Sequence, residues 1–209
     1  MPISAPRPLR VALTGGIATG KSYVRARLAA AGIPTLDADA VAHELLRPGT
    51  PIAAAVVERF GPGVATQGGG VDRKALGRIV FADAGERAAL ERLVHPAVYE
   101  RVAEWMAGLA SSGAPWAVAD IPLLYETGRE GEFDRVVVVA CDPRRQVERV
   151  MARDGLPEAA ARARIAAQWP IECKVALADF VVRTDGSFEE TDRQVDALLG
   201  RLSALGSGH

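Results

Sequence analysis

Near the N-terminus, a run of glycines followed by a lysine and a serine has the types and spacing of a phosphate-binding loop. The segment GGIATGKS, residues 15–22, fits the pattern G-x-x-x-x-G-K-[ST]. Glycines let successive backbone N–H groups turn toward an anion without a Cβ in the way, and a helix N-terminus adds the positive end of its dipole. Lys21 can reach the β- and γ-phosphates, and Ser22 offers an oxygen to Mg²⁺. The pattern therefore predicts that the chain binds a nucleoside triphosphate.

Two aspartates, Asp37 and Asp39, lie in the segment LDADAVAHELL, where a predicted strand gives way to a helix. If that segment is extended, residues two apart point the same way, toward the carboxyl edge at which α/β proteins bind ligands. A carboxylate there can take the proton from an acceptor hydroxyl as it attacks the γ-phosphate. The alternative is that one of them caps the helix. For Asp37 both interpretations stay open, whereas for Asp39 we favour the catalytic base.

A third acid, Asp120 in VADIPLLYE, ends an apolar run that we predict to be a strand. At this place P-loop enzymes carry the acid that holds Mg²⁺ or its water shell, and we favour that role over a solvated strand end. Glu126 closes the same motif. His95 precedes Pro96, and for this histidine a buried hydrogen-bonded position and a contact to the acceptor both remain open.

Arginines cluster after the fourth predicted strand, at Arg144, Arg145, Arg149, Arg153, Arg162 and Arg164. A run of arginines is usually a solvated helix face. In a P-loop protein, however, this is also where a lid brings arginines onto the transferred phosphoryl group. Arg149 and Arg153 are four residues apart and share one helix face. We expect these two to act at the phosphates and the other four to lie at the surface.

Hydrophobic periodicity and the positions of Gly and Pro divide the chain into alternating strands and helices. We expect strands at 9–15, 33–39, 116–124, 135–141 and 178–184. We expect helices at 22–31, 40–46, 52–60, 72–81, 84–95, onward to 109 after a break at His95–Pro96, 144–168 and 189–202. Strands separated by helices predict an α/β protein with a doubly wound sheet. The helical block at about 47–110 interrupts the alternation and predicts an inserted lobe.

Composition narrows the class of protein further. The chain has 209 residues and a net charge of −1, which gives no reason to expect nucleic-acid binding. Two cysteines are too few for a disulfide framework and indicate a reducing compartment. No apolar run is long enough to cross a membrane, and the segment MPISAPRPLR lacks an apolar signal core. These features predict a soluble, cytoplasmic globular protein.

The residues that are absent also separate one P-loop class from another. The chain contains no asparagine, so it cannot carry the Asn-Lys-x-Asp motif with which GTPases read guanine. Signature sequences of larger motor ATPases are missing too. Small-molecule or nucleotide kinases remain, with a non-catalytic nucleotide-binding module as the alternative. Lysine occurs at three positions only, Lys21, Lys74 and Lys174, in a chain that otherwise uses arginine.

Taken together, six segments resemble the dephospho-CoA kinase family. They are LTGGIATGKS, DADAVAHEL, LERLVHPAV, ADIPLLYETG, RVMARDG and KVALADFVV, and they follow the family order over residues 13 to about 187. The P-loop alone is unspecific, whereas the DAD, HP and D-x-P-L-L-x-E segments at these separations are highly specific. Two departures are Tyr23, where the family usually has Thr after the P-loop serine, and Thr184, where it has Asn near the adenine.

This resemblance implies a three-layer P-loop NTPase fold of the adenylate-kinase-like type, with a parallel five-stranded sheet, a helical substrate lobe and a lid. The implied domains are a nucleotide-binding core at 8–46, 111–143 and 178–204, a CoA-binding lobe at 47–110 and a lid at 144–177. ATP and Mg²⁺ are the implied cofactors. The implied reaction is phosphorylation of the ribose 3′-hydroxyl of dephospho-CoA, the last step of CoA synthesis. The alternative is another small P-loop kinase acting on a nucleotide or small alcohol.

The site residues that this assignment implies fall into four groups. The catalytic group is Asp39 as base, Lys21 and Arg149. The nucleotide-binding group is Gly15, Gly16, Ile17, Ala18, Thr19, Gly20, Lys21, Ser22, Tyr23, Arg153 and Thr184. The substrate-binding group is Asp37, Asp39, His95, Asp120 and Leu123. Ser22 and Asp120 would hold Mg²⁺, directly or through water. We expect no nucleic-acid or membrane partner, and a monomer or weak homo-oligomer.

Overall fold

The computed structural model describes residues 7–206, so 1–6 and 207–209 lie outside the described part. Five strands form one sheet in the order β2-β3-β1-β4-β5. Their bounds are β1 Leu9–Gly15, β2 Thr35–Asp37, β3 Trp116–Asp120, β4 Arg135–Ala140 and β5 Phe180–Arg183. The register pairs β1 in parallel with β3 and β4, and β4 with β5. The predicted α/β class and parallel five-stranded sheet are confirmed.

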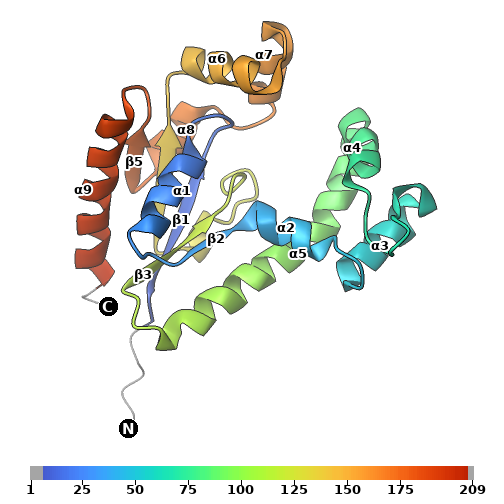
Figure 1. The fold of residues 1–209 in the computed structure, drawn as a ribbon, viewed down its shortest axis with the longest axis horizontal. Coiled ribbons are helices and arrows are strands. Elements are labelled where there is room, and N and C mark those ends of the chain that lie inside the picture. The colour runs from blue at the N-terminus through green and yellow to red at the C-terminus, as the bar shows by residue number, and fades with distance from the viewer. Residues whose placement is uncertain (1–6, 207–209) are drawn as a thin grey trace. The chain divides into compact units, whose positions relative to one another are not determined.

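Helices follow the strands along the chain (Figure 1). Their bounds are α1 Lys21–Ala30, α2 Ala38–Leu45, α3 Pro51–Phe60, α4 Arg73–Ala82, α5 Ala84–Gly108, α6 Pro143–Asp154, α7 Glu158–Ala166, α8 Ile171–Leu177 and α9 Phe188–Gly206. Short 3₁₀ turns lie at Pro62–Val64, Leu109–Ser111 and Glu130–Glu132. Within residues 7–206, no helix has both the length and the apolar character needed to cross a membrane.

The chain separates into two compact units, residues 1–36 with 106–209, and residues 37–105. The first unit holds β1, β3, β4 and β5 with α1 and α6 to α9. The second unit is helical, with α2, α3, α4 and most of α5, and its buried side chains are mainly aliphatic. Three of its helix starts are capped locally, by Asp37 for α2, Thr50 for α3 and Asp72 for α4.

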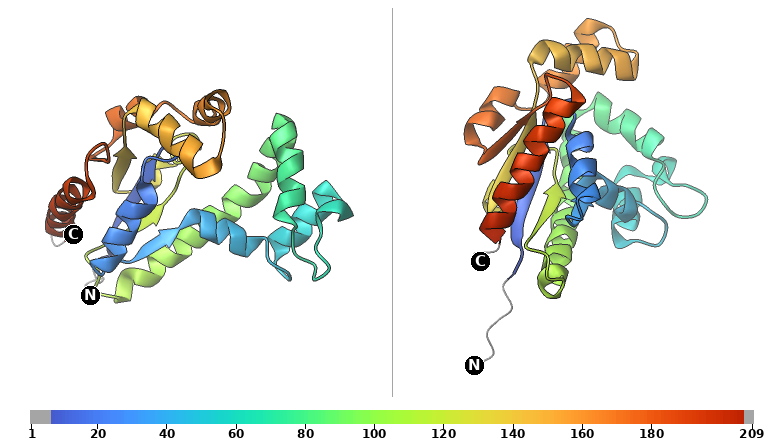
Figure 2. Two further views of the ribbon diagram at one scale, coloured as in Figure 1. Left: turned by 45° about the horizontal axis from the view of Figure 1, so that its top comes forward. Right: turned by 60° about the vertical axis from the view of Figure 1, so that its left-hand side comes forward.

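The core of the first unit lies between the sheet and the helices α1 and α9. These two helices contact each other and lie side by side along the strands (Figure 2). Alternate residues of β1 face them, as the period of two in a strand requires. The core cluster is Leu9, Val11, Leu13, Val24, Leu28, Trp116, Val118, Val137, Val139, Val182, Val195, Leu198 and Leu202. This packing fixes the end of β1 and the start of α1, which bound the glycine-rich loop.

Three sequence expectations were wrong in detail. Pro96 does not break a helix, since α5 runs through it from 84 to 108. The ring removes one backbone donor, yet the buried side chains of Val94 and Val98 hold the helix on both sides of it. The arginine-rich region 144–168 is two helices, because Gly155 takes a left-handed conformation at φ 65° and ends α6. The second strand is only three residues long, and α2 begins at Ala38.

Candidate functional site

Residues 15–22 form the loop that joins β1 to α1. Gly20 is the N-cap of α1 and has φ 86°, a left-handed conformation that favours glycine. Gly15 and Gly16 are required for a different reason, which is close packing. A Cβ on Gly15 would lie 2.5 Å from the Val139 carbonyl oxygen, and one on Gly16 would lie 2.5 Å from Gln146 Nε2. The glycine pattern thus lets the loop turn and lets neighbouring elements approach its backbone.

Four carbonyl groups of this loop accept hydrogen bonds from side chains outside it. Those of Gly15, Ile17, Ala18 and Thr19 accept from the side chains of Lys174, Gln146, Arg149 and Thr184, at 3.3, 2.7, 3.4 and 2.7 Å. The Gly16 carbonyl accepts from the backbone and hydroxyl of Thr19, at 3.3 and 2.9 Å. The N–H of Ile17 donates to Gln168 Oε1 at 2.8 Å. Side chains from α6, α8, the residue after β5 and the segment after α7 therefore orient the loop.

A trans peptide points its C=O and N–H in opposite directions, and residues 7–206 contain no cis peptide. Carbonyls bonded outward therefore direct the following amides inward. Within residues 7–206, the loop amides that donate to no protein acceptor are those of Gly16, Ala18, Gly20, Lys21 and Ser22. The last two belong to the first turn of α1, whose N–H groups have no partner within the helix. Such an array of amides at a helix N-terminus binds phosphate.

Lys21 is ion-paired with Asp120 at the end of β3. Asp120 is only 2% exposed, and its other carboxylate oxygen lies 3.1 Å from Arg25 Nε. The register places Asp120 beside Leu13, two residues before the loop begins. Arg25 is four residues after Lys21, so α1 brings both cations to one carboxylate. Phosphate oxygens would compete with Asp120 for the lysine ammonium.

Ser22 and Asp120 are the two residues at which the sequence predicts Mg²⁺. Ser22 is exposed in the first turn of α1, and Asp120 presents a carboxylate at the neighbouring strand end. Within the described residues, no group of three or more His, Cys, Asp or Glu side chains gathers to hold a metal. Mg²⁺ needs no such group, since it commonly takes one or two protein oxygens and completes its shell with water and substrate phosphates. The donor set fits that requirement.

Of the two arginines expected at the phosphates, only Arg149 reaches the loop. Its guanidinium donates to Ala18 O, to Thr184 Oγ1 at 2.9 Å and to Thr184 O at 2.6 Å. Arg153 instead donates to Asp154 at 2.7 and 3.0 Å, and Arg164 donates to the same carboxylate. These contacts lower the pKa of Asp154, with the hydrogen bond from Arg153 as the largest cause.

Beside the loop lies a cavity of about 520 Å³, lined by residues of the loop, α1, α6 and the segment 184–191. The Tyr23 and Phe188 rings lie at its edge, with centroids 4.9 Å apart, and the Tyr23 hydroxyl donates to Asp192 at 2.8 Å. Thr184 also lines the cavity, and its hydroxyl is bonded to Thr19 O and Arg149. The cavity has the volume and partly apolar lining of a small-molecule pocket.

Asp37 and Asp39 belong to the helical unit and do not lie on one extended strand, so that expectation was wrong. Asp37 ends β2 and caps α2, where its Oδ1 accepts from Asp39 N at 3.0 Å and Ala40 N at 3.4 Å. Asp39 is in the first helical turn with its side chain exposed. The cap satisfies amides of the first turn, so the helix begins two residues earlier than predicted.

The two other substrate residues of the sequence prediction lie in separate units. His95 is half-buried in the middle of α5. Leu123 is in the turn after β3, where its carbonyl accepts from Thr127 N at 3.1 Å and Thr127 Oγ1 at 2.8 Å.

Sequence reasoning missed three residues that hold the loop, namely Gln146, Gln168 and Lys174. Gln146 and Gln168 bond to the two sides of Ile17, at its carbonyl and its amide. The residues around each glutamine do not predict its contact with the loop, because each bond joins residues more than 125 positions apart. Lys174 did have a signal, since it is one of three lysines in the chain.

The comparisons with known proteins agree with one another. A family model described as dephospho-CoA kinase matches residues 9–190. A dephospho-CoA kinase from Anaeromyxobacter dehalogenans is 50% identical over 92% of this chain and 91% of its own length. The crystal structure of TT1252 from Thermus thermophilus has a TM-score of 0.77 at 38% identity and covers 94% of this chain and 98% of its own. A dephospho-CoA kinase from Campylobacter jejuni has a TM-score of 0.73 at 27% identity, with 93% and 97% covered.

Proposed function

The chain belongs to the dephospho-CoA kinase family, and from that premise we propose how its own residues carry out the reaction. The activity is ATP-dependent phosphorylation of dephospho-CoA in CoA biosynthesis. We propose that the acceptor is its ribose 3′-hydroxyl, as the family resemblance implies. The observation that supports our assignment of the donor site is the loop at 15–22, whose carbonyls are bonded outward and whose amides remain for phosphate.

On the donor side, the amides of the loop and of the first turn of α1 bind the β- and γ-phosphates of ATP. Lys21 moves from Asp120 onto the phosphate oxygens, while Arg25 keeps Asp120 paired. Because the loop amides are already oriented, they stabilise the charge that develops in the transition state without reorganising. The cavity lined by Tyr23, Thr184 and Phe188 holds the nucleoside part of ATP.

Ser22 and Asp120 would hold Mg²⁺, with Asp120 acting directly or through water. When bound there, Mg²⁺ would neutralise negative charge on the phosphates. Asp120 keeps its carboxylate in place through its pair with Arg25 after Lys21 has moved to the phosphates.

On the acceptor side, Asp39 is the general base that takes the proton of the ribose 3′-hydroxyl. Its carboxylate is exposed, whereas the cap formed by Asp37 fixes the backbone from which it projects. Asp37 thus positions the base rather than replacing it. His95 and Leu123 would contact the dephospho-CoA, and this assignment rests on their place in the family motifs.

Arg149 is the arginine that acts at the transferred phosphoryl group. It is anchored next to the loop through Ala18 O and Thr184, and its long side chain is flexible enough to move from these contacts toward a bound phosphate. Arg153 is less suited to act at the transferred phosphoryl group, because its guanidinium is paired with Asp154.

The domain roles follow the same assignment and remain proposals. Residues 8–46, 111–143 and 178–204 form the nucleotide-binding core, 47–110 the CoA-binding lobe and 144–177 the lid. We also propose that the enzyme is cytoplasmic, acts as a monomer or weak homo-oligomer, and needs no nucleic-acid or membrane partner.

An assay of ATP consumption tests the acceptor directly. We expect turnover with dephospho-CoA and little with AMP, shikimate or pantothenate at the same concentration. Turnover with one of the other acceptors alone would point to another small P-loop kinase. ATP binding without turnover on any acceptor would identify a nucleotide-binding module and contradict the proposal.

A further inference from the structure

Lys174 on α8 is a buried ammonium group that the reaction described above does not use. Its side chain is 0% exposed. Its Nζ lies 2.7 Å from Glu126 Oε1, 3.3 Å from Gly15 O and 3.4 Å from Pro122 O. An ammonium has three N–H donors, and here three acceptors meet it. Each of its three N–H donors therefore has an acceptor, although water does not reach the ammonium.

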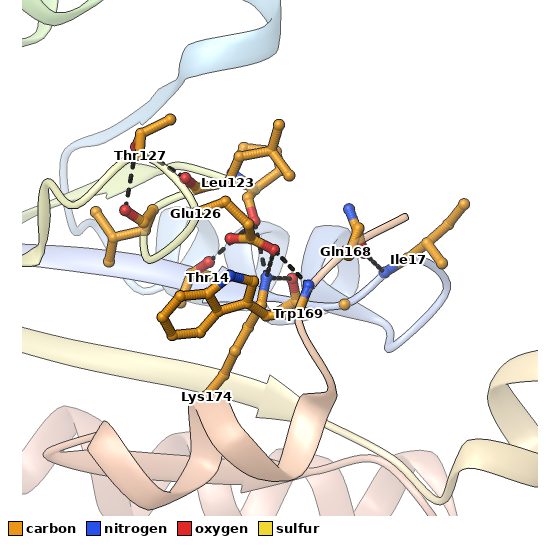
Figure 3. Close-up of polar contacts among 12 residues, drawn as sticks. Thr14, Ile17, Leu123, Glu126, Thr127, Gln168, Trp169 and Lys174 are labelled. Atoms are coloured by element: carbon orange, nitrogen blue, oxygen red, sulfur yellow. Dashed lines mark hydrogen bonds and ion pairs between the residues drawn. The ribbon is translucent and has the colours of Figure 1, made fainter. Parts of the chain in front are cut away.

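The acceptors of Lys174 belong to the two segments that form the donor site. Gly15 begins the phosphate-binding loop, and Pro122 follows Asp120 by two residues in the turn after β3. Glu126 lies further along that turn, and its Oε1 also accepts from the backbone N–H of Trp169 at 3.0 Å. Figure 3 shows the lysine rising from α8 to this carboxylate, with the Trp169 backbone meeting it from the other side.

The contact to Gly15 has a geometric consequence for phosphate binding. Because the C=O of Gly15 points to Lys174, the N–H of the same peptide, which belongs to Gly16, points away from it. That N–H is one of the amides left for phosphate. Losing the ammonium would free this peptide to rotate, and the glycines on both sides would not resist the rotation.

Packing alone does not account for a charged pair at this place. A buried ion pair is often no more stabilising than apolar side chains of the same volume, whereas removing one partner is strongly destabilising. The stem of Lys174 could be replaced by an apolar chain, but only the ammonium can bond to two backbone carbonyls and a carboxylate at once.

We propose that Lys174, paired with Glu126, is a positioning residue for phosphoryl transfer, which orients the Gly15–Gly16 peptide and the turn that follows Asp120. This inference rests on the proposed function of the loop as the ATP site. It assigns no chemical step to Lys174, which contacts neither ATP nor acceptor. The same pair also holds the chain where the lid region leads into α8, because Glu126 accepts from the backbone N–H of Trp169.

Three variants test the proposal: Lys174→Met, Glu126→Gln and the two combined. Lys174→Met keeps the apolar length of the side chain but leaves the Glu126 carboxylate unpaired, so thermal stability should fall. The combined variant leaves no unpaired buried charge, so most of the lost stability should return. We expect ADP affinity by titration calorimetry, and kcat, to stay about tenfold or more below wild type in the combined variant. KM for dephospho-CoA should change less than about twofold.

A purely structural role predicts that activity recovers together with stability. Wild-type ADP affinity and kcat in the combined variant would therefore overturn the proposal. If Lys174→Met and the combined variant do not fold, Glu126→Gln decides, because it removes the carboxylate charge that holds the ammonium against the Gly15 and Pro122 carbonyls. We expect ADP binding about threefold or more weaker in that variant, and unchanged binding would contradict the positioning role.

Arg193→Met is the matched control, since it removes an exposed cation from α9 and should change neither stability nor binding. ADP titration also separates this inference from the proposed function. A wild-type protein that binds ADP but does not phosphorylate dephospho-CoA would contradict the proposed acceptor, while the effect of Lys174 on ADP binding would still be measured.

Discussion

The loop at 15–22 and the acidic segment at 37–39 are held in opposite ways. Side chains that lie 129 to 165 positions away in the sequence bond to the loop carbonyls. The acidic segment is held by its own neighbours, because the Asp37 carboxylate accepts from amides two and three residues on. Thr19 of the loop is 0% exposed, whereas Asp39 is exposed.

The difference corresponds to what each region would do in the reaction. Phosphate binding needs many donors in fixed positions, and preorganised donors are worth most where they need not move. A general base needs one accessible carboxylate within hydrogen-bond reach of the hydroxyl. A rigid donor site and a locally capped acceptor residue therefore suit the two halves of one transfer. The predictions below test this contrast, and the first concerns the rigid side.

Replacing Lys21 should have the largest effect. Lys21→Ala removes the ammonium from the β- and γ-phosphates, and we expect kcat to fall by about 10³-fold. The fold should survive, since Asp120 keeps its pair with Arg25. Lys21→Arg should fail as well, because a planar guanidinium does not fit a site shaped for a point charge. Steady-state kinetics with a melting curve measures both effects, and wild-type turnover in either variant would contradict the P-loop assignment.

On the acceptor side, Asp39→Asn should lower kcat by about 10²-fold or more, since general-base help is worth about 10² to 10⁴. Melting and ATP binding should stay at wild-type values, because the side chain is exposed. The matched variant is Asp37→Ala, which removes the cap and should cost about 0.5 to 2 kcal/mol of stability. A rate within a few-fold of wild type for Asp39→Asn would exclude Asp39 as the base and make Asp37 the next candidate.

Arg149→Ala should lower kcat by about tenfold to a hundredfold and raise KM for ATP less, if the guanidinium acts mainly as the reaction proceeds. Arg153→Ala is the comparison, because its guanidinium pairs with Asp154. We expect kinetics close to wild type for that variant. The opposite pattern, with Arg153→Ala impaired and Arg149→Ala normal, would reverse the assignment of the two arginines.

Asp134 lies outside both regions and should affect stability alone. A hydrogen bond from Arg7, the largest cause, holds the pKa of Asp134 at about 2. Since the folded pKa is below the unfolded value, this stabilisation is present above about pH 4 and is lost as the pH falls toward 2. Asp134→Asn should therefore cost about 1 kcal/mol at neutral pH, because Arg7 is half exposed and solvent screens the pair.

Thermal unfolding of the Asp134→Asn variant at several pH values measures this contribution. The difference from wild type should shrink as the pH approaches 2, and kcat at neutral pH should be unchanged. A large loss of kcat would show that stability and the reaction are coupled, and it would weaken the contrast between the two regions.

The sequence was informative where the signal is local. The strand, glycine loop and helix at 9–31 follow from apolar runs and glycine spacing, and they were predicted within one residue. The continuation of α5 through Pro96 was not predictable, because buried neighbours outweigh the missing hydrogen bond. The start of α2 depended on which aspartate caps it, and a pattern of alternating acids does not decide that.

Long-range support of the site was the part that sequence could not supply. Gln146 and Gln168 bond to the two peptide groups on either side of Ile17, and nothing in their own segments distinguishes them from solvated glutamines. Lys174 could be noticed from the scarcity of lysine, yet its partners could not be named. A side chain that bonds to a distant backbone group produces no periodic pattern in the sequence, so such a contact cannot be predicted from periodicity.

The same long-range contacts also bear on how the molecule is made. The loop is synthesised well before its supports at Gln146, Arg149, Gln168, Lys174 and Thr184, which follow it by more than 120 positions. Contacts so distant in sequence form late, because the long intervening segment must first be closed. A nascent chain therefore carries the loop sequence long before it can bind phosphate. Nucleotide can then stabilise only the completed fold, so it cannot assist the earlier steps of folding.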